Sequence, residues 1–470
     1  MKRVLSFCAK ALLVLAVVVL LLGLSCLAPV DTSTWTNSVL GVELESALRA
    51  VRAKTNVLTG ELRAGFGRAR LTPELGAESD DPERGRFRSL PLAGYGARRG
   101  RPATGVHDEL WAKAVALAVN GRTGVVVTAD ALIIPRDVAE RAAAMLADRG
   151  IGRDDLYFGA THTHSSIGGW GMGAVAEAFA GKFVPAFPEW FARRLAAAAR
   201  AALDDMAPAS AGVTCFQSSE HVRNRLVGNS GPVDPRFRLI VIVQEDGDRA
   251  VIGSYSAHAT VLPAETMSFS GDYPGAWAEH LERSSCKLAM FMAGGVGSHA
   301  PRPGAPAWEG IDRMGRQLAV QTRTAVDNVT VTNKVAFGLV TLKIRLPQLQ
   351  VRLADKVKLR PWLARLFLPV GQYTRVQALR LAEAVWLSTP CDFSGELAMD
   401  RVIPPDESDR TAVTSFNGDY VGYVIPSKYY HMRGYEPRTM SFYGPQLPDY
   451  MSEALRRIAD VVRNGKEYRP

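Results

Sequence analysis

The chain contains few cysteines: Cys8, Cys26, Cys215, Cys286 and Cys391 are the five among 470 residues. None of them forms a C-x-x-C pair, so the sequence offers no structural zinc knuckle. An odd, sparse set of cysteines also does not make a disulfide scaffold. Sequence alone leaves open whether Cys215 and Cys286 pair in an oxidising compartment.

Internal repeats, low-complexity tracts and nucleic-acid-binding motifs are also missing from the sequence. The formal net charge is +9, but without a motif this charge does not indicate DNA or RNA as a partner. It suits an anionic membrane surface or an acidic lipid instead. Hydrophobic residues make up 47% and charged residues 22% of the chain, which is globular composition and excludes general disorder. The oligomeric state cannot be inferred from these properties.

One long apolar run is present near the N-terminus. Residues 11–28 carry no charge and follow the basic sequence MKRVLSFCAK. A run of this length can just span a bilayer as a helix, and the basic flank predicts that the N-terminus lies inside. A cleaved signal peptide is the alternative, but the run is long for one, which favours an uncleaved anchor in residues 1–30. In both cases the body is expected on the extracytoplasmic side, periplasmic or cell-surface.

The remaining sequence predicts an α/β fold with mixed β-sheets flanked by helices. Residues 31–60 are expected to be a connector with a short amphipathic helix, and residues 61–470 one large catalytic domain. Strand-like runs alternate with alanine-rich helical stretches, which is typical of this class. The expected strands are 125–130, 156–164, 237–243, 250–258, 287–295 and 335–345, and the expected helices are 138–148, 188–206, 276–283 and 310–325.

Residues 351–370 mix arginine and lysine with leucine, tryptophan and phenylalanine. A helix whose apolar stripe packs on the core is the more common explanation of such a segment. The alternative is a basic amphipathic segment that lies on a membrane surface.

A pair of histidines gives the strongest chemical signal. His162 and His164 lie in GATHTHSS, at the end of a predicted strand. Residues two apart on a strand point to the same side, so both imidazoles are expected to project together. One can bind a metal while the other carries protons or binds substrate. His258, Asp392 and a tyrosine-rich segment after residue 420 follow, although none of these carries a claim alone.

Taken together, the order of these segments resembles the neutral (non-lysosomal) ceramidase family. The matching blocks are GATHTHS (159–165), AHAT (257–260), PCDF (390–393), YVGYVIP (420–426) and GYEPRTMSFYGP (434–445), with further matches in 93–117, 125–135, 224–225 and 270–275. The resemblance runs from about Gly65 to the C-terminus. It implies the catalytic domain of that family, without the C-terminal immunoglobulin-like domain of longer members.

The resemblance also implies a zinc site with four protein ligands, namely His162, His258, Asp392 and Tyr423. Two imidazoles, a carboxylate and a further oxygen suit Zn²⁺. His164, Arg225 and Tyr435 would then hold the amide carbonyl and the developing oxyanion. The implied substrate is an N-acyl lipid such as ceramide, a sphingolipid, and the implied partner is a membrane.

Two positions depart from the family pattern. The family's P-G-E is P-C-D here, so the carboxylate of Asp392 is one methylene shorter. The block that holds the family's active-site serine reads GVGSHAP at 295–301, which places Ala300 at the serine position. Ser298 lies two residues earlier and could act as a catalytic nucleophile only if the loop shifts.

We therefore expect a zinc-dependent amidohydrolase that uses metal-activated water, with His164 as the proton carrier. Arg225 and Tyr435 would stabilise the oxyanion. One alternative is a catalytically silent, membrane-tethered lipid-binding protein, which Ala300 favours. The other is a zinc hydrolase of a different envelope amide or ester, because one fold can serve different substrates.

The topology of the leader can be tested directly. If residues 11–28 are an uncleaved anchor, the mature protein begins near Met1 and resists extraction by carbonate, because a spanning helix stays in the bilayer. N-terminal mass spectrometry of the membrane fraction checks this expectation. Recovery of a soluble form that begins near residue 27–32 would show that the leader is removed.

Overall fold

Two β-sheets that share one long strand form the centre of the molecule. The computed structural model describes residues 2–55, 57–368, 370–464 and 467–468. The shared strand β2 (Val57–Arg70) pairs through residues 58–61 with β16 and through residues 62–70 with β6. Both parallel and antiparallel pairs occur, so the predicted mixed sheets are confirmed.

One sheet has the strand order β14-β12-β11-β9-β2-β6-β7-β8, and the other has the order β2-β16-β19-β20-β22. Their bounds are β6 Trp111–Val119, β7 Arg122–Ala129, β8 Leu156–Ala160, β9 Ala207–Gln217, β11 Arg236–Gln244, β12 Arg249–Tyr255, β14 Leu288–Ala293, β16 Lys334–Arg345, β19 Tyr373–Leu381, β20 Ala384–Ser388 and β22 Thr411–Thr414. Short pairs outside these sheets are β3 (Glu74–Leu75) with β4 (Arg86–Phe87), β5 (Gly105–Val106) with β13 (Ser268–Phe269), β10 (Val222–Asn224) with β15 (His299–Pro301), and β21 (Asp392–Phe393) with β23 (Tyr423–Val424). Near the C-terminus, β24 (Glu467–Tyr468) adds to β2.

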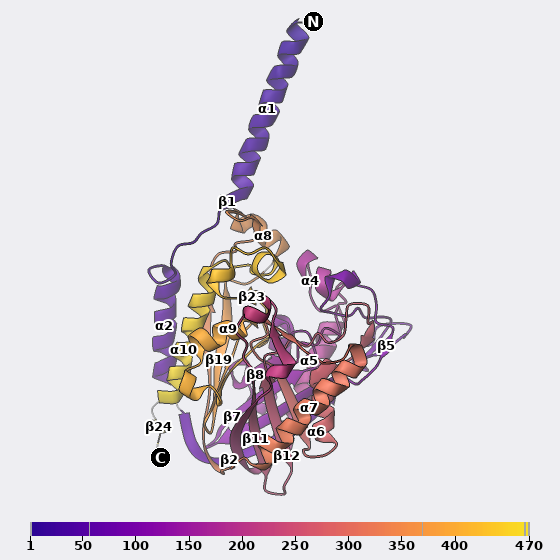
Figure 1. Cartoon of the computed structure of the whole chain (residues 1–470), viewed down its shortest axis with the longest axis vertical. Coiled ribbons are helices and arrows are strands. Elements are labelled where there is room, and N and C mark those ends of the chain that lie inside the picture. Colours follow the sequence, from indigo (N-terminus) through magenta and orange to yellow (C-terminus); the bar gives the residue numbers. More distant parts are fainter. Residues whose placement is uncertain (1, 56, 369, 465–466, 469–470) are drawn as a thin grey trace.

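Helices cover the outer face of each sheet, as predicted (Figure 1). Their bounds are α1 Lys2–Cys26, α2 Val39–Lys54, α3 Arg136–Ala144, α4 Ala174–Ala180, α5 Phe187–Asp204, α6 Asp272–Glu282, α7 Ala307–Asp327, α8 Pro361–Phe367, α9 Gly395–Leu397 and α10 Gln446–Asn464. Apolar residues of α2 and α10 pack on the β16–β19 sheet. Those of α3 and α5 pack on the β6–β7–β8 part of the other sheet, and those of α6 and α7 pack on β11, β12 and β14. A separate apolar core fills the space between the two sheets.

The segment predicted as one amphipathic helix over 351–370 has a different structure. Its first part forms a hairpin of β17 (Arg352–Ala354) and β18 (Val357–Leu359). Only α8 is helical, and it begins at Pro361, whose fixed φ suits the first turn of a helix. Since proline also ends any preceding helix, a single helix through this position was the wrong expectation.

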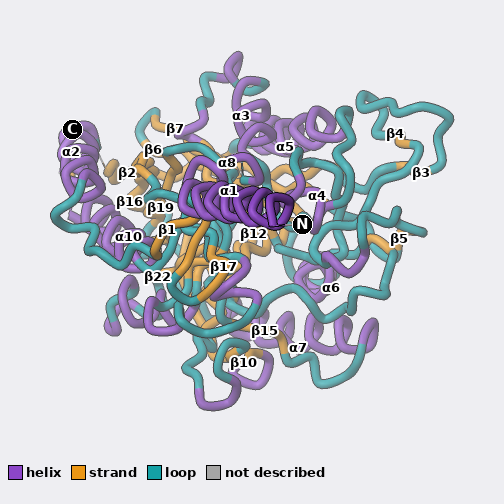
Figure 2. The backbone as a smooth tube through the Cα atoms, turned by 90° about the horizontal axis from the view of Figure 1, so that it is seen from above, coloured by secondary structure: helices purple, strands orange, loops and turns teal. Residues whose placement is uncertain are grey.

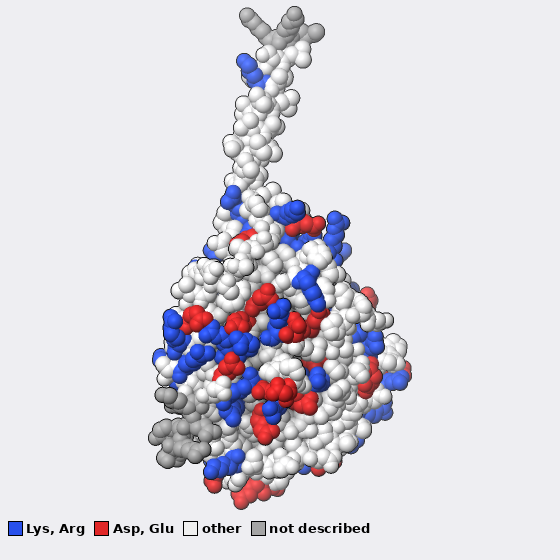
Figure 3. Space-filling view, turned by 60° about the vertical axis from the view of Figure 1, so that its left-hand side comes forward, with Lys and Arg blue, Asp and Glu red and all other residues white. Residues whose placement is uncertain are grey.

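Helix α1 extends away from the body, and β24 lies at the opposite end of the molecule (Figure 1). Residues Leu5–Cys26 are long and apolar enough to cross a membrane. Lys10 is the only charged residue among them, and the helix looks almost free of charge in the space-filling view (Figure 3). Seen from the α1 end, α8 and β17 lie beside the foot of this helix (Figure 2). All five cysteines are free thiols, so Cys215 and Cys286 are not paired.

The packing of α10 on its sheet can be tested with two neighbouring residues. Leu455 is fully buried in the apolar core, whereas Arg456 is exposed and forms surface ion pairs. We expect Leu455→Ala to lower the free energy of unfolding by about 2–5 kcal/mol, because it leaves a cavity. The matched control Arg456→Ala should change it by no more than about 0.5 kcal/mol. Urea denaturation in detergent measures both, and equal effects would contradict the assigned packing.

Candidate metal centre

Three histidines and one aspartate meet where strands of both sheets end. His162 follows β8, His258 follows β12, and Asp392 follows β20. The Nε2 atom of His258 lies 2.9 Å from that of His162 and 3.1 Å from that of His164. Oδ1 of Asp392 lies 3.1 Å from Nε2 of His162 and 3.9 Å from Nε2 of His258. The three imidazoles together form a group that could hold a metal ion.

The hydrogen bonds that His162 and His258 make through Nδ1 determine which ring atoms face the centre of the cluster. Nδ1 of His162 lies 2.7 Å from the carbonyl oxygen of Leu132, and Nδ1 of His258 lies 3.2 Å from that of Val296. A carbonyl oxygen can only accept, so a proton on each Nδ1 satisfies it, and in the neutral rings both Nε2 atoms then present lone pairs. Oδ1 of Asp392 is buried and receives no hydrogen bond. With both rings neutral, three electron-rich atoms therefore converge, as the ligands of a cation do.

Burial favours the neutral form of the His164 and His258 imidazoles. It holds the pKa of His164 and of His258 well below the usual value, and the charge that His162 carries when protonated and the charge of Arg225 lower both pKa values further. Neutral imidazole is the form that binds metals. The electrostatics of the cluster therefore match the lone-pair geometry.

The backbone at His162 differs from the expectation. The predicted strand 156–164 ends at Ala160, and His162 has a φ of 61°, in the left-handed region. His162 and His164 therefore do not project together as alternate residues of one strand. Their rings still meet, 5.0 Å apart, because the chain turns as the His162 amide donates to the carbonyl of Ala131. The ring of Phe416 stacks on His162 at 4.0 Å and supports this unusual conformation.

A buried arginine fixes the loop that carries His164. The Arg98 guanidinium donates to four backbone carbonyls, among them those of Ala93 and His164. Gly94 lies so close to His164 that an added Cβ would come within 2.6 Å of its side chain, and its φ is 107°. The Tyr95 ring lies 4.8 Å from the imidazole. Residues 93–98 therefore form a backing for the His164 side chain.

Two tyrosines approach the aspartate in different ways. The Tyr420 hydroxyl donates to Oδ2 of Asp392 at 2.8 Å, which leaves Oδ1 to face the histidines. Tyr423 is held next to Asp392 by the pairing of β21 with β23. Burial raises the pKa of both phenols well above the usual value, and the Asp392 charge raises it further.

Arg225 and Tyr435 lie at the rim of the cluster. The Arg225 side chain forms an ion pair with Glu436 at 2.5 Å, and one of its nitrogens lies 3.4 Å from Nδ1 of His258. The Tyr435 ring is 46% exposed and lies 5.8 Å from that of Tyr423. The structure thus brings a fixed cation and an accessible phenol to the edge of the histidine group.

Ser298 has a different environment from the other predicted site residues. Its hydroxyl is buried, lies 2.7 Å from Nδ1 of His299 and 2.8 Å from the hydroxyl of Ser394. The amide of Glu396 also points at it, at 3.4 Å. Among the described residues, none of its hydrogen bonds reaches the three clustered histidines. Ala300 is buried in β15.

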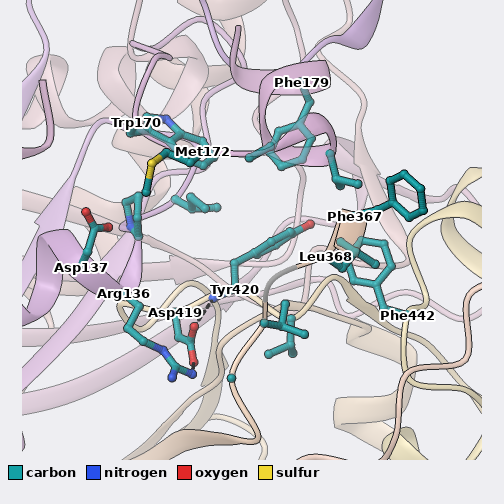
Figure 4. A pocket seen from close by; sticks show the side chains of 18 of the residues that line it. Arg136, Asp137, Trp170, Met172, Phe179, Phe367, Leu368, Asp419, Tyr420 and Phe442 are labelled. Atoms are coloured by element: carbon teal, nitrogen blue, oxygen red, sulfur yellow. Dashed lines mark hydrogen bonds and ion pairs between the residues drawn. The ribbon is translucent and has the colours of Figure 1, made fainter. Parts of the chain in front are cut away.

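An apolar cavity of about 450 Å³ lies beside the cluster. The ring of Tyr420 projects into it, with Trp170 and Phe179 facing the ring from one side (Figure 4). Phe367 and Phe442 form another part of its wall. None of the three histidines lines the cavity. Tyr420 connects the cavity with the histidine cluster, because its ring lies in the cavity wall and its hydroxyl donates to Asp392.

Sequence reasoning missed four contributors to this site: Arg98, Phe416, Tyr420 and Glu436. Tyr420 and Glu436 lie directly inside blocks that were singled out, so a search for partners of Asp392 and Arg225 could have found them. Arg98 and Phe416 act through a backbone carbonyl and a ring stack, which no local pattern reveals.

Comparison with known proteins supports the fold. No protein-family model matches the chain. No curated protein matches it in sequence. Among solved structures, neutral ceramidase from Pseudomonas aeruginosa is similar with a TM-score of 0.70 and 18% identity, over 86% of this chain and 75% of that one. A ceramidase complexed with C2 is similar with a TM-score of 0.70 and 17% identity, over 87% and 76%. The chain therefore has the fold of the neutral ceramidases, as its sequence blocks predicted.

Proposed function

We propose that this protein hydrolyses the amide bond of an N-acyl lipid of the ceramide type at a zinc ion. The observation that supports this most is the convergence of the lone pairs of His162 and His258 with the unpaired Oδ1 of Asp392. The shared fold with two ceramidase structures adds to it. The apolar cavity next to the cluster suits a lipid chain, since its volume lies in the range of small-ligand sites.

His162, His258 and Asp392 would hold the metal, with the Tyr423 phenol as a further oxygen ligand. Two imidazole nitrogens and a carboxylate form the donor set of many catalytic zinc sites. When bound there, zinc would supply Lewis-acid polarisation of the amide carbonyl and an activated water.

His164 has the properties of the proton carrier. Its Nδ1 is buried and unpaired, and its position is fixed by the 93–98 loop. A neutral imidazole there can accept a proton from the attacking water and return it to the leaving amine. His164 also belongs to the group of possible metal ligands, so the two roles need an experiment that separates them.

Arg225 and Tyr435 would stabilise the negative charge that develops on the carbonyl oxygen. The Glu436 ion pair fixes the Arg225 guanidinium before substrate arrives, so it needs little reorganisation during the reaction. The half-exposed Tyr435 can donate its phenolic proton, because burial raises its pKa to about 12. The phenol therefore stays protonated at neutral pH.

A silent lipid-binding protein remains the second candidate. Ala300 provides no side-chain hydroxyl, and that of Ser298 is engaged by His299 and Ser394. Both facts argue against a serine nucleophile, but they do not affect hydrolysis by water.

Metal content tests the ligand set. We expect about one zinc per chain. His162→Ala and His258→Ala should lose most of this zinc, because removal of one of about three protein ligands greatly lowers the affinity of a catalytic zinc site. The control is His280→Ala, since His280 of α6 pairs with the exposed Asp312 of α7, away from the histidine cluster. Elemental analysis of the purified proteins gives the result. Full zinc occupancy in both ligand variants would refute the site.

Turnover separates the roles of His164 and Ser298. Loss of a general acid–base should make His164→Ala about 10²–10⁴-fold slower while zinc is retained. Loss of zinc in the same variant would identify His164 as a ligand instead.

Ser298→Ala should keep much of the rate in an assay with N-acyl lipids. A covalent acyl adduct on Ser298, detected by mass spectrometry, would overturn the water mechanism, and no turnover of any N-acyl lipid by the unaltered protein would favour the silent candidate.

A further inference from the structure

The foot of the apolar helix α1 is fixed to the body by strand pairing. Directly after Cys26, β1 (Leu27–Pro29) pairs with β18, with Leu27 opposite Leu359 and Pro29 opposite Val357. The amide of Arg360 continues the pairing and donates to the carbonyl of Cys26 at 2.8 Å. No free linker therefore separates the end of α1 from the body.

Side chains at the start of α8 extend this attachment onto α1 itself. The Arg360 guanidinium donates two hydrogen bonds to the carbonyl of Leu24, at 3.0 and 3.1 Å. The Trp362 indole donates to the carbonyl of Ser25 at 3.3 Å. Carbonyls of the last turn of a helix lack intrahelical partners, and a cation there is favoured by the helix dipole. These bonds hold α8 at the level where α1 ends.

At this level the body exposes large apolar side chains. On α8, Trp362 is 54% exposed, Leu366 70% and Phe367 50%, while Ala364 packs inward. Met172, 70% exposed, precedes α4 and lines the same cavity as Phe367. Clustered exposed apolar side chains are unusual on a soluble surface and mark a contact with a partner.

The charges around these side chains specify what the partner is. Lys356, Arg360 and Arg365 are exposed beside them, and several basic atoms, with acidic ones between them, lie where α1 meets the body (Figure 3). Tryptophan at the headgroup level, with arginine and lysine beside apolar side chains, is typical of segments that lie in a membrane interface. Anionic lipid headgroups attract such basic residues.

We propose that α8 and the loop at Met172 form a membrane-contact surface that lies in the headgroup layer of the bilayer spanned by α1. The candidate span Leu5–Cys26 ends where α8 is attached, so a bilayer around α1 places its interface at Trp362 and Leu366. This inference concerns the orientation of the body and does not depend on amide hydrolysis. It means that the cavity wall at Phe367 lies at the membrane surface.

Photocrosslinking in vesicles tests the surface. The full-length chain, reconstituted in phosphatidylcholine–phosphatidylglycerol vesicles, carries p-benzoylphenylalanine at position 366 or, in a second variant, at position 172. The matched control is position 320 on α7, an exposed valine far from α8. After irradiation, mass spectrometry should find lipid adducts at 366 and 172 on the order of tenfold above those at 320, because an interfacial side chain contacts acyl chains.

Two results would overturn the proposal. One is lipid adduct at both 366 and 172 at the level of the control position. The other is crosslinking of these positions to a second copy of the chain, which would assign the surface to self-association. Two labelled positions keep the test valid if one variant fails to fold. Since turnover is not measured, failure of the hydrolase assignment would leave this result unaffected.

Discussion

Buried electron-rich atoms that face one another are unfavourable unless a proton or a cation lies between them. The lone pairs of His162 and His258 and the unpaired Oδ1 of Asp392 lie close together in the protein interior. An unpaired buried acceptor costs about 1–3 kcal/mol, and more when it is charged. A cation removes this cost, so the same geometry that is unfavourable alone becomes a binding site. The surrounding structure can be understood as the means of holding these atoms in place.

That support comes from segments distant in sequence. Backbone carbonyls of Leu132 and Val296 orient the two rings, and the Tyr420 hydroxyl orients the carboxylate. Such outer partners commonly decide the tautomer and the basicity of metal ligands. The short side chain of Asp392 comes within 3.1 Å of His162, and the pairing of β21 with β23 holds it there.

The extent to which sequence predicted this arrangement differs between features. Strands β7, β8, β11, β12, β14 and β16 and helices α2, α3, α5, α6 and α7 were expected from local sequence patterns, whereas the shared strand β2 and strands β6, β9, β19, β20 and β22 were not. The histidines and Asp392 followed from ordered blocks that resemble a family. The strand expected to carry both His162 and His164 ends at Ala160. The chain turns there because His162 has a left-handed backbone conformation and its amide donates to the carbonyl of Ala131, which follows β7. The roles of Arg98 and Phe416 depend on tertiary contacts, which no local pattern encodes. Pro361 was visible in the sequence, and its effect on residues 351–370 was underestimated.

The pairing of β1 with β18 has a mechanical consequence for the reach of the protein. A flexible linker lets a tethered domain sample a volume that grows with linker length. Here α1 passes directly into a strand of the body, so this pairing would restrict rotation of the body about α1. With α1 in a bilayer, such a protein would search its own leaflet by lateral diffusion and would not reach an apposed membrane. The β1–β18 pairing would thus limit the region that the body can reach and would keep the histidine cluster at a constant distance from the lipid surface.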